Sequence, residues 1–189
     1  METFTYKEIL QQPSCWIKEY EVLLEEKTRI QAFLEKYLTN ETDIVLTGAG
    51  TSAFIGDAIA PLLRGVWKNV RAVATTDIVT NAADYLVADK PLLLISFARS
   101  GNSPESVAAV NLANAICKNV AHIYITCNKN GHLAQSANAE NILSLLLPEE
   151  TDDKSLAMTS SFSTMLLTCL MISQIDHIEA ERERRGCGC

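Results

Sequence analysis

The sequence predicts an α/β fold: a three-layer sandwich with a five-stranded parallel sheet, flavodoxin-like or Rossmann-like, preceded by a long N-terminal helix. Three observations lead to this prediction. Short apolar segments alternate with helical ones along most of the 189 residues, as in proteins with parallel sheets. The apolar segment 91–97 is unbroken, which is typical of a strand covered on both faces. Polar loops that contain glycine directly follow two of the apolar segments, where the ligands of such sheets bind.

Five apolar segments are the predicted strands, and four longer segments are the predicted helices. The strands are residues 43–47, 70–74, 91–97, 121–126 and 141–147. The helices begin after Pro13-Ser14, after Ser52, at Ser103-Pro104 and at Ser160, and the last runs to about Gln174. At the third helix, Ser103 is a favoured N-cap, Pro104 suits the first turn, and Glu105 complements the helix dipole.

The first helix carries a long apolar stripe. Its members recur at helical spacing and are Trp16, Tyr20, Leu23, Leu24, Ile30, Phe33, Leu34 and Tyr37. Either the rest of the domain or a second subunit is expected to cover this stripe. A chain of this length favours one domain. The predicted organisation is an N-terminal helical segment at 1–40, one α/β domain at 41–175, and a charged, disordered tail at 176–189.

The composition excludes several partners and cofactors. The formal net charge of -7 and the pI of about 5.0 argue against nucleic acid, whose phosphates require clustered Lys and Arg. The sequence has no run of 18 apolar residues and no signal-peptide pattern, so no membrane span and a cytoplasmic location are expected. Four cysteines are expected to be buried free thiols, namely Cys15, Cys117, Cys127 and Cys169. Cys187 and Cys189 are too few ligands for structural zinc, and no metal or cofactor is expected.

The first polar loop, Thr47 to Ser52, reads Thr-Gly-Ala-Gly-Thr-Ser and joins a strand to a helix. Glycines let the backbone approach a ligand closely, and free amides at a helix start favour an anion. Gly50, Thr51 and Ser52 are therefore candidate phosphate-binding residues. The loop also fits a dinucleotide fingerprint, but the acid expected about 20 residues later is displaced to Asp77. It is not a Walker loop, because no Gly-Lys-Ser/Thr follows.

The second polar loop, residues 98–106, follows the most apolar strand. Ser100, Asn102 and Ser103 have the side chains to donate to phosphate oxygens together with the loop amides. A capping role for Ser103 would explain one residue and leave the rest of the cluster unexplained, so we interpret the loop as phosphate-binding. Arg99 is either a phosphate partner or a surface charge, and the sequence does not decide between the two.

The third polar cluster, residues 155–164, lies at a predicted helix start. Consecutive Ser and Thr residues are more favourable at the start of a helix than in its interior. Ser160 and Ser161 are therefore candidates for the same site, although this cluster alone is weak evidence.

Taken together, the three loops resemble the sugar isomerase (SIS) domain family. Gly-Ala-Gly-Thr-Ser, Ser-Gly-Asn-Ser-Pro-Glu-Ser and Leu-Ala-Met-Thr-Ser-Ser-Phe-Ser-Thr-Met occur in that family's order and spacing. The sequence is most similar to the AgaS-type subfamily, described as tagatose-6-phosphate ketose/aldose isomerase or galactosamine-6-phosphate deaminase/isomerase. The resemblance runs to about Ile172. It implies a SIS fold at 41–175, a sugar-phosphate ligand, and a homodimer formed through the SIS domains and the N-terminal helix.

The same resemblance implies roles for individual residues. Thr51, Ser52, Ser100 and Ser103 would hold the phosphate, Gly50, Gly101 and Asn102 would shape the loops, and Ser160 and Ser161 would lie at the edge of the site. One departure from the family is Ala98, where a Ser is common, and this removes one phosphate donor.

Length is the larger departure from the family. AgaS-type proteins resemble two SIS domains in tandem, and this sequence matches the first. In the two-domain isomerases the acid/base Glu and the ring-opening His come from the second half, so the catalytic residues stay unassigned. Glu105 is expected to stabilise its helix start, and His122 and His132 to be structural or solvated. The side on which Asp57 faces is not predicted, and none of the four is assigned as the base. The abrupt change in character after Ile175 also leads us to expect a shortened or frame-shifted gene product.

Three functions remain open at this point. The first is an AgaS-type enzyme, complete or completed by a partner chain. The second is a module that binds a phosphosugar without turnover, and the third is an inactive fragment with an exposed interface. The motifs favour the enzyme lineage, whereas the lack of a convincing base leaves the binding module and the inactive fragment as alternatives. The sequence does not choose among galactosamine-6-phosphate, tagatose-6-phosphate and related sugars.

Overall fold

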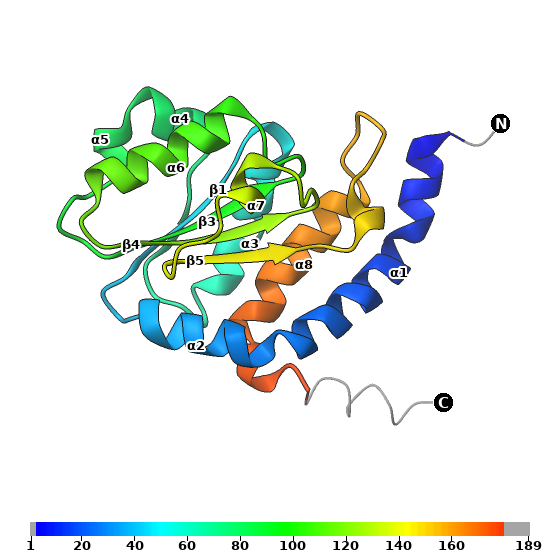
Figure 1. Cartoon of the computed structure of the whole chain (residues 1–189), viewed down its shortest axis with the longest axis horizontal. Helices are drawn as coiled ribbons and strands as arrows, with labels where there is room; N and C mark the ends of the chain where they lie inside the picture. The colour runs from blue at the N-terminus through cyan, green and yellow to red at the C-terminus, as the bar shows by residue number, and fades with distance from the viewer. Residues whose placement is uncertain (1–2, 180–189) are drawn as a thin grey trace.

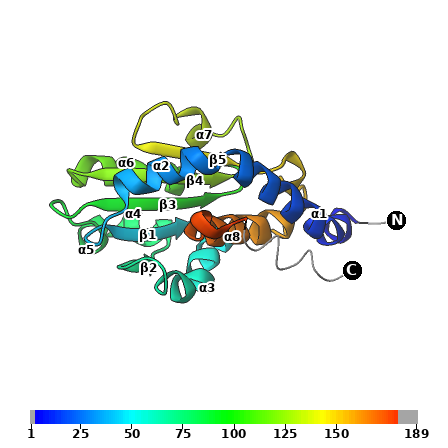
Figure 2. The same cartoon turned by 90° about the horizontal axis from the view of Figure 1, so that it is seen from below.

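A computed structural model describes residues 3–179 of the chain. Its centre is a five-stranded sheet between two helical layers, seen from two directions in Figures 1 and 2. The strands are β1 (Asp43–Gly48), β2 (Val70–Ala72), β3 (Leu92–Ala98), β4 (Val120–Thr126) and β5 (Ile142–Leu146). All neighbouring strands are parallel, in the order β2-β1-β3-β4-β5. The predicted α/β fold with a five-stranded parallel sheet is confirmed.

The direction of strand addition reverses between β1 and β3, which are neighbours in the sheet although β2 separates them in sequence. Their carboxyl ends are level, because Gly48 is the register partner of Phe97. Ligands of doubly wound sheets bind at such a switch point, outside the carboxyl ends of the strands. This topology therefore directs attention to the loops that follow β1 and β3.

Helices cover both faces of the sheet. They are α1 (Phe4–Glu25), α2 (Lys27–Tyr37), α3 (Ala53–Leu63), α4 (Thr75–Thr80), α5 (Ala82–Tyr85), α6 (Pro104–Ile116), α7 (His132–Gln135) and α8 (Ser160–Ser173). Short 3-10 turns occur at Gly50–Ser52, Glu149–Thr151 and Ile175–His177. The layer with α1, α2, α3 and α8 lies on one side of the sheet, and α4, α5 and α6 lie on the other (Figure 1).

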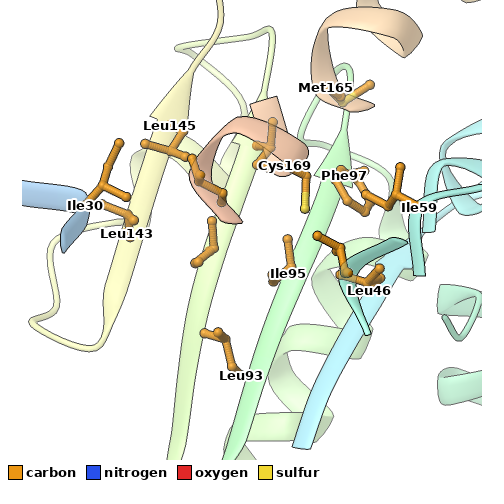
Figure 3. Packing of buried hydrophobic residues seen from close by; sticks show 14 of the residues in the cluster. Ile30, Leu46, Ile59, Leu93, Ile95, Phe97, Leu143, Leu145, Met165 and Cys169 are labelled. Carbon is orange, nitrogen blue, oxygen red and sulfur yellow. The ribbon is translucent and has the colours of Figure 1, made fainter. Parts of the chain in front are cut away.

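The first face of the sheet forms the larger core. Leu46, Ile95 and Phe97 point from β1 and β3 into the layer that contains α3 and α8, where Met165 and Cys169 meet them (Figure 3). Leu23 and Ile30 of the N-terminal helices belong to the same buried cluster. Burial of each large apolar side chain contributes about 1.5–3 kcal/mol, so the N-terminal segment is stabilised by the domain it covers.

Alternate residues of the same strands point to the second face. Val45, Leu94 and Tyr124 pack there against the layer formed by α4 and α6. His122 lies on this face too, fully buried, with Nε2 3.0 Å from Oδ1 of Asn114 in α6. Burial on both faces explains why the strands read as nearly continuous apolar runs.

The first helix begins at Phe4, so the start predicted after Pro13 was too late. Proline lacks a backbone N–H group and would leave the carbonyl of Ile9 without its partner within the helix. The Gln12 side-chain amide donates to that carbonyl at 3.1 Å instead. This substitute hydrogen bond allows one helix to run through the proline.

Packing continues beyond residue 175, into the segment predicted as a tail. Ile178 is buried, and the Tyr20 hydroxyl donates to its carbonyl at 3.1 Å. Residues 180–189, with Cys187 and Cys189, lie outside the described residues, so the disordered-tail prediction is untested there. Across residues 3–179, no helix combines the length and the apolar character needed to cross a bilayer.

Candidate functional site

Of the loops that leave the carboxyl edge of the sheet, four are relevant to the site, that is, all except the short loop after β2 (residues 73–74). They follow β1 (residues 49–52), β3 (99–103), β4 (127–131) and β5 (147–159). The loops after β1 and β3 lie at the same edge of the sheet, as predicted from the sequence, and the strand order shows that they flank the switch point. The loop after β4 was not assigned a role by the sequence analysis, yet it contacts the loop after β3 directly.

The loop after β1 depends on glycine at two positions. At Gly48 a Cβ atom would lie 2.6 Å from the backbone carbon of Ser52, so a side chain does not fit there. Gly50 has a φ of +55°, which other residues rarely adopt. Thr51 is exposed, whereas Ser52 is buried with its Oγ 3.8 Å from the sulfur of Met158. A thioether is a weak acceptor, so a phosphate oxygen would be a better partner for the Ser52 hydroxyl.

The loop after β3 combines an exposed hydroxyl with a helix cap. Gly101 has a φ of +66°, and the exposed Ser100 hydroxyl accepts a 3.3 Å hydrogen bond from the Asn102 backbone N–H. Ser103 caps α6: its hydroxyl accepts from the Ser106 backbone N–H at 3.3 Å and donates to the Ser106 hydroxyl at 2.6 Å. The capping role considered for Ser103 is therefore present, and it does not account for Ser100.

The loop after β4 supports the loop after β3 from behind. The Asn128 side-chain amide donates to the Ser100 carbonyl at 3.0 Å, and the Leu133 backbone N–H donates to the Gly101 carbonyl at 3.2 Å. Gly131 packs so closely that a Cβ there would lie 2.4 Å from the Ser100 carbonyl oxygen. The sequence signal for this support was Asn128 and Gly131 just after a strand end, and it was overlooked.

Asn102 and His132 connect the same two loops. The Asn102 side-chain oxygen accepts a 2.8 Å hydrogen bond from the His132 backbone N–H at the start of α7. The Asn102 side chain thereby joins the loop after β3 to the start of α7. His132 takes part through its backbone, and its ring makes no contribution to this bond.

The third cluster converges on a buried carboxylate that the sequence analysis did not single out. Asp153 accepts hydrogen bonds from the Thr159 and Ser161 backbone N–H groups at 2.8 and 2.9 Å, from the Ser161 hydroxyl at 2.6 Å, and from the Ser160 hydroxyl. Gln11 of α1 also donates to Ser160 Oγ at 2.9 Å. Ser160 and Ser161 are fully buried, so their hydroxyls orient the start of α8 and the loop before it.

The hydrogen bonds to Asp153 also govern its ionisation. Burial by itself raises the pKa of this carboxyl group, but the bonds from Ser160, Ser161 and the Thr159 backbone outweigh burial and lower the pKa below its ordinary value. Asp153 is therefore ionised at neutral pH, which strengthens its capping of α8.

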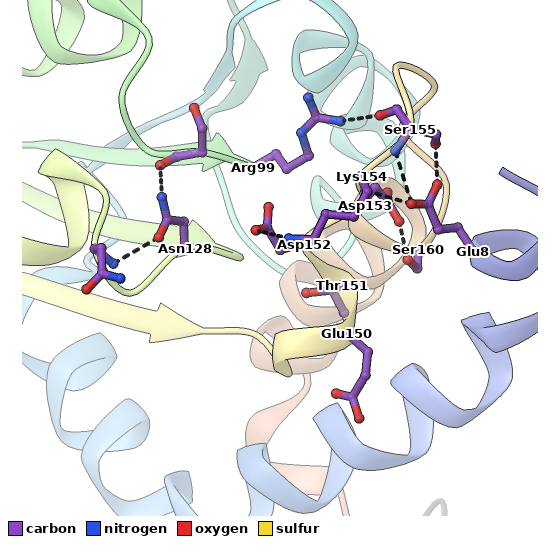
Figure 4. Close-up of polar contacts among 12 residues, drawn as sticks. Glu8, Arg99, Asn128, Glu150, Thr151, Asp152, Asp153, Lys154, Ser155 and Ser160 are labelled. Carbon is purple, nitrogen blue, oxygen red and sulfur yellow. Dashed lines mark hydrogen bonds and ion pairs between the residues drawn. The ribbon is translucent and has the colours of Figure 1, made fainter. Parts of the chain in front are cut away.

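Arg99 connects the loop after β3 with the loop after β5. Its Nη1 donates to the Ser155 carbonyl at 3.1 Å, as Figure 4 shows. The side chain is half-buried rather than a solvated surface charge. It remains the cation nearest in sequence to Ser100, so its charge still adds to the field at that loop.

The acid and base candidates from the sequence are not gathered around the two loops. Asp57 and Glu105 are exposed, on α3 and in the first turn of α6. His122 lies within the sheet, in register with Leu94, and burial lowers its pKa to about 4. None of these three side chains makes a hydrogen bond that would prepare it for proton transfer at the switch point, within residues 3–179.

A surface groove of about 490 Å³ lies at the opposite edge of the sheet. Asp43, at the start of β1, lines it together with Arg71 and Lys90. The Arg71 guanidinium is 2.7 Å from the Asp43 carboxylate, and the Lys90 ammonium is 3.6 Å from it. Asp84 also lines the groove, so two carboxylates balance the two cations. Because the groove is also at the amino ends of the strands, we do not assign the ligand to it.

The fold and its loops define a class of protein: a doubly wound α/β domain with hydroxyl and backbone donors gathered at the switch point of its sheet. Residues 37–173 match the sequence profile of the SIS domain, and the chain belongs to this family. The resemblance deduced from the three loops is thereby confirmed.

Named relatives agree with the AgaS-type similarity. A D-galactosamine-6-phosphate deaminase AgaS of Escherichia coli is 50% identical over 185 residues, or 96% of this chain and 48% of that protein. A protein of the same name from Shewanella sp. (strain ANA-3) is 46% identical over 175 residues, 89% of this chain and 45% of the relative. The crystal structure of tagatose-6-phosphate ketose/aldose isomerase from Escherichia coli superimposes with a TM-score of 0.89 at 51% identity, covering 93% and 49% of the two chains. The chain spans about half the length of these relatives.

Proposed function

We propose that this chain binds the phosphate group of a sugar phosphate between the loops that follow β1 and β3. The observation that carries the proposal is the meeting of these two glycine-shaped, hydroxyl-bearing loops at the switch point of a SIS-type sheet. Each loop opens a helix of several turns, α3 or α6, whose first backbone N–H groups favour an anion. An acidic protein can hold one phosphate in this way without a cationic patch.

In this proposal the residues of the site fall into three groups. Thr51, Ser52, Ser100 and Ser103 donate to the phosphate, Gly50, Gly101 and Asn102 shape the loops, and Ser160 and Ser161 act at the edge of the site through Asp153. Ser103 and Ser52 exchange their present contacts for phosphate oxygens, whereas Ser100 is already exposed.

The proposed ligand is a 6-phosphorylated sugar such as galactosamine-6-phosphate or tagatose-6-phosphate, by similarity to the named relatives. The proposed reaction is deamination or ketose/aldose isomerisation. Both begin with transfer of a proton between neighbouring carbons, which requires a base beside the carbon and a group that polarises the oxygen. The binding energy of the phosphate would hold the reacting carbons in place for that step.

A second candidate is binding without turnover. The observation that favours it is the placement of the acid and base candidates, since Asp57 and Glu105 are solvated and His122 is buried away from the loops. If a base from a second SIS domain completes the site, this chain supplies the phosphate half of that site.

A homodimer is also part of the proposal. The N-terminal part of α1, from Phe4 to Ile17, exposes large apolar side chains, namely Phe4, Tyr6, Ile9, Leu10 and Ile17. This part of α1 extends past the end of the sheet in Figure 1. Light scattering should give a dimer mass for the wild type, and a Leu10→Glu, Ile17→Glu variant should shift to monomer.

We also propose a cytoplasmic location. Phosphorylated sugars carry charge that keeps them within the compartment in which they are made. Among residues 3–179 the cysteines are free and buried, as is usual in a reducing compartment; they are Cys15, Cys117, Cys127 and Cys169.

Calorimetry with galactosamine-6-phosphate, tagatose-6-phosphate and inorganic phosphate tests the binding proposal. We expect the sugar phosphates to bind and a Ser100→Ala, Ser103→Ala variant to lose at least about tenfold in affinity. Ser173→Ala is the matched control, because Ser173 lies at the far end of α8 with its hydroxyl on the Leu170 carbonyl.

Ammonia release and isomerisation measured on the same samples separate the two candidate functions. Turnover that disappears in the double variant supports the enzyme, and binding without turnover supports the binding module. A folded wild type that binds none of the three compounds would refute the phosphate site.

A further inference from the structure

Ser155, in the loop between β5 and α8, is held from two distant parts of the chain. From one side, the Glu8 carboxylate of α1 accepts hydrogen bonds from the Lys154 and Ser155 backbone N–H groups at 2.6 and 3.1 Å, and from the Ser155 hydroxyl. From the other side, Arg99 donates to the Ser155 carbonyl at 3.1 Å. Figure 4 shows Glu8 and Arg99 approaching Ser155 from opposite directions. The segment is thereby fixed to α1 and to the loop after β3 at once.

Glu8 is a charged residue that is only 5% exposed. Burial of a carboxylate is unfavourable unless hydrogen bonds compensate it, and here Oε1 accepts two backbone N–H groups while Oε2 accepts a hydroxyl. Glu8 also precedes residues 37–173, which match the SIS profile. The contact is therefore contributed by the N-terminal helix and not by the SIS core.

The segment that Glu8 holds borders both loops of the proposed phosphate site. At one end, Arg99 comes from the loop after β3, and at the other the Met158 sulfur lies 3.8 Å from Ser52 Oγ in the loop after β1. Between these contacts Leu156 is 97% exposed. A large apolar side chain held in water beside a ligand site is available to pack on the ligand.

We propose that Glu8 is a positioning residue, which fixes residues 155–158 as the wall contacted by the sugar part of the ligand. This inference rests on the phosphate site proposed above. The phosphate itself would be held by loops that their own glycines and Asn128 shape. Loss of Glu8 therefore weakens recognition of the sugar and leaves recognition of the phosphate nearly unchanged.

The test compares two probes in the full chain. Calorimetry with galactosamine-6-phosphate and with inorganic phosphate is carried out on the wild type, Glu8→Ala, Glu8→Gln and Glu21→Ala. Glu21 is the control because it is an exposed glutamate on the same helix. We expect Glu8→Ala to raise the Kd for the sugar phosphate about tenfold and the Kd for inorganic phosphate less than about twofold.

Glu8→Gln provides a conservative rescue. Its amide oxygen still accepts from the two backbone N–H groups, so we expect the sugar-phosphate Kd to rise only about threefold. Hydrogen exchange without ligand gives an independent readout, since the Lys154 and Ser155 amides should exchange faster in Glu8→Ala than in Glu21→Ala.

The outcomes distinguish this inference from the binding proposal. Equal losses for both probes would show that Glu8 merely stabilises the fold, and no loss for the sugar phosphate would show that the segment does not contact the sugar. Either result overturns the positioning role and leaves the phosphate site standing. A wild type that binds neither probe overturns both proposals.

Discussion

The Asn128 side chain donates a 3.0 Å hydrogen bond to the backbone carbonyl of Ser100. This bond makes the shape of the loop after β3 depend on the loop after β4, one strand further along the sheet. Gly131 of the loop after β4 also packs closely against this carbonyl oxygen. The proposed phosphate loop is therefore set from behind by residues that would not touch the ligand, and their substitution should alter binding.

Gly131→Ala should distort the proposed phosphate loop. The new methyl group would lie 2.4 Å from the Ser100 carbonyl oxygen, so the backbone of one loop must move. We expect a loss of about 1–3 kcal/mol in the free energy of unfolding and at least a tenfold weaker phosphate affinity. Denaturant titration and calorimetry measure the two effects.

Gly65→Ala is the control for that substitution, because its nearest neighbour would be the Leu62 carbonyl oxygen at 3.3 Å, away from the strand carboxyl ends. It should leave phosphate affinity unchanged. Unaltered binding in Gly131→Ala would mean that Ser100 does not depend on this support.

Asp153→Ala should destabilise the start of α8. It removes a carboxylate that accepts five hydrogen bonds, two from backbone N–H groups and three from hydroxyls. We expect a loss of about 3 kcal/mol in the free energy of unfolding, and a smaller loss in Asp153→Asn, which keeps one acceptor.

The pH dependence of the same variants provides a further check. The folded-state pKa of Asp153 is lowered, so its stabilising contribution is present above the ordinary value of 3.8 and is lost as pH falls through the folded pKa. The stability difference between wild type and Asp153→Asn should therefore shrink at acid pH. A difference that stays constant down to pH 2 would contradict the assignment.

The sheet could be predicted from the sequence because its determinants are local. Each buried strand is a short apolar run, and Gly50 and Gly101 mark the loops after β1 and β3 in the sequence. The alternation of strands and helices predicted that the strands are parallel, whereas their order was not predicted. The end of the third strand shifted by one residue, to Ala98, which does not alter the site.

The features that the sequence analysis did not predict depend on contacts between residues far apart in sequence. Glu8 contacts Ser155, which is 147 residues later in the chain, and the residues around Glu8 in sequence do not indicate this contact. Ser160 and Ser161 were recognised as polar, but their partner Asp153 becomes evident only when the loop before α8 is folded. The helix start predicted after Pro13 was wrong because the Gln12 side chain donates to the Ile9 carbonyl in place of the missing proline N–H group. Such a side-chain contact is not evident from the sequence.

His122 should make the fold sensitive to mild acid. Burial lowers its pKa from 6.5 to about 4, so between these values the unfolded chain binds a proton that the folded chain does not. Stability should fall as pH decreases from 6.5 toward 4. His122→Gln removes this contribution, and we expect its stability to decline about 1–2 kcal/mol less than the wild type between pH 7 and 4.5. Equal declines in urea denaturation would contradict a neutral, buried His122.

Glu19 should have the opposite effect, because it lowers stability as pH rises. It is buried between α1 and α8, where Oε1 accepts a 2.9 Å hydrogen bond from the Thr168 hydroxyl and Oε2 has no partner among the described residues. Burial raises its pKa from 4.5 to about 8, although the bond from Thr168 acts in the other direction. The folded chain therefore keeps a proton that the unfolded chain releases above about 4.5, so stability falls as pH rises from there to about 8.

Glu19→Gln replaces the protonated acid with a neutral side chain of nearly the same shape. We expect this variant to be more stable than the wild type by roughly 2 kcal/mol at pH 9 and similar to it at pH 5. Glu21→Gln, on the exposed side of the same helix, is the control and should match the wild type at both pH values. Urea denaturation at the two pH values measures the difference. A loss of stability in Glu19→Gln at pH 9 would mean that Glu19 is ionised and paired in the folded chain. Its Oε2 would then require a hydrogen-bond donor, and none lies beside it among the described residues.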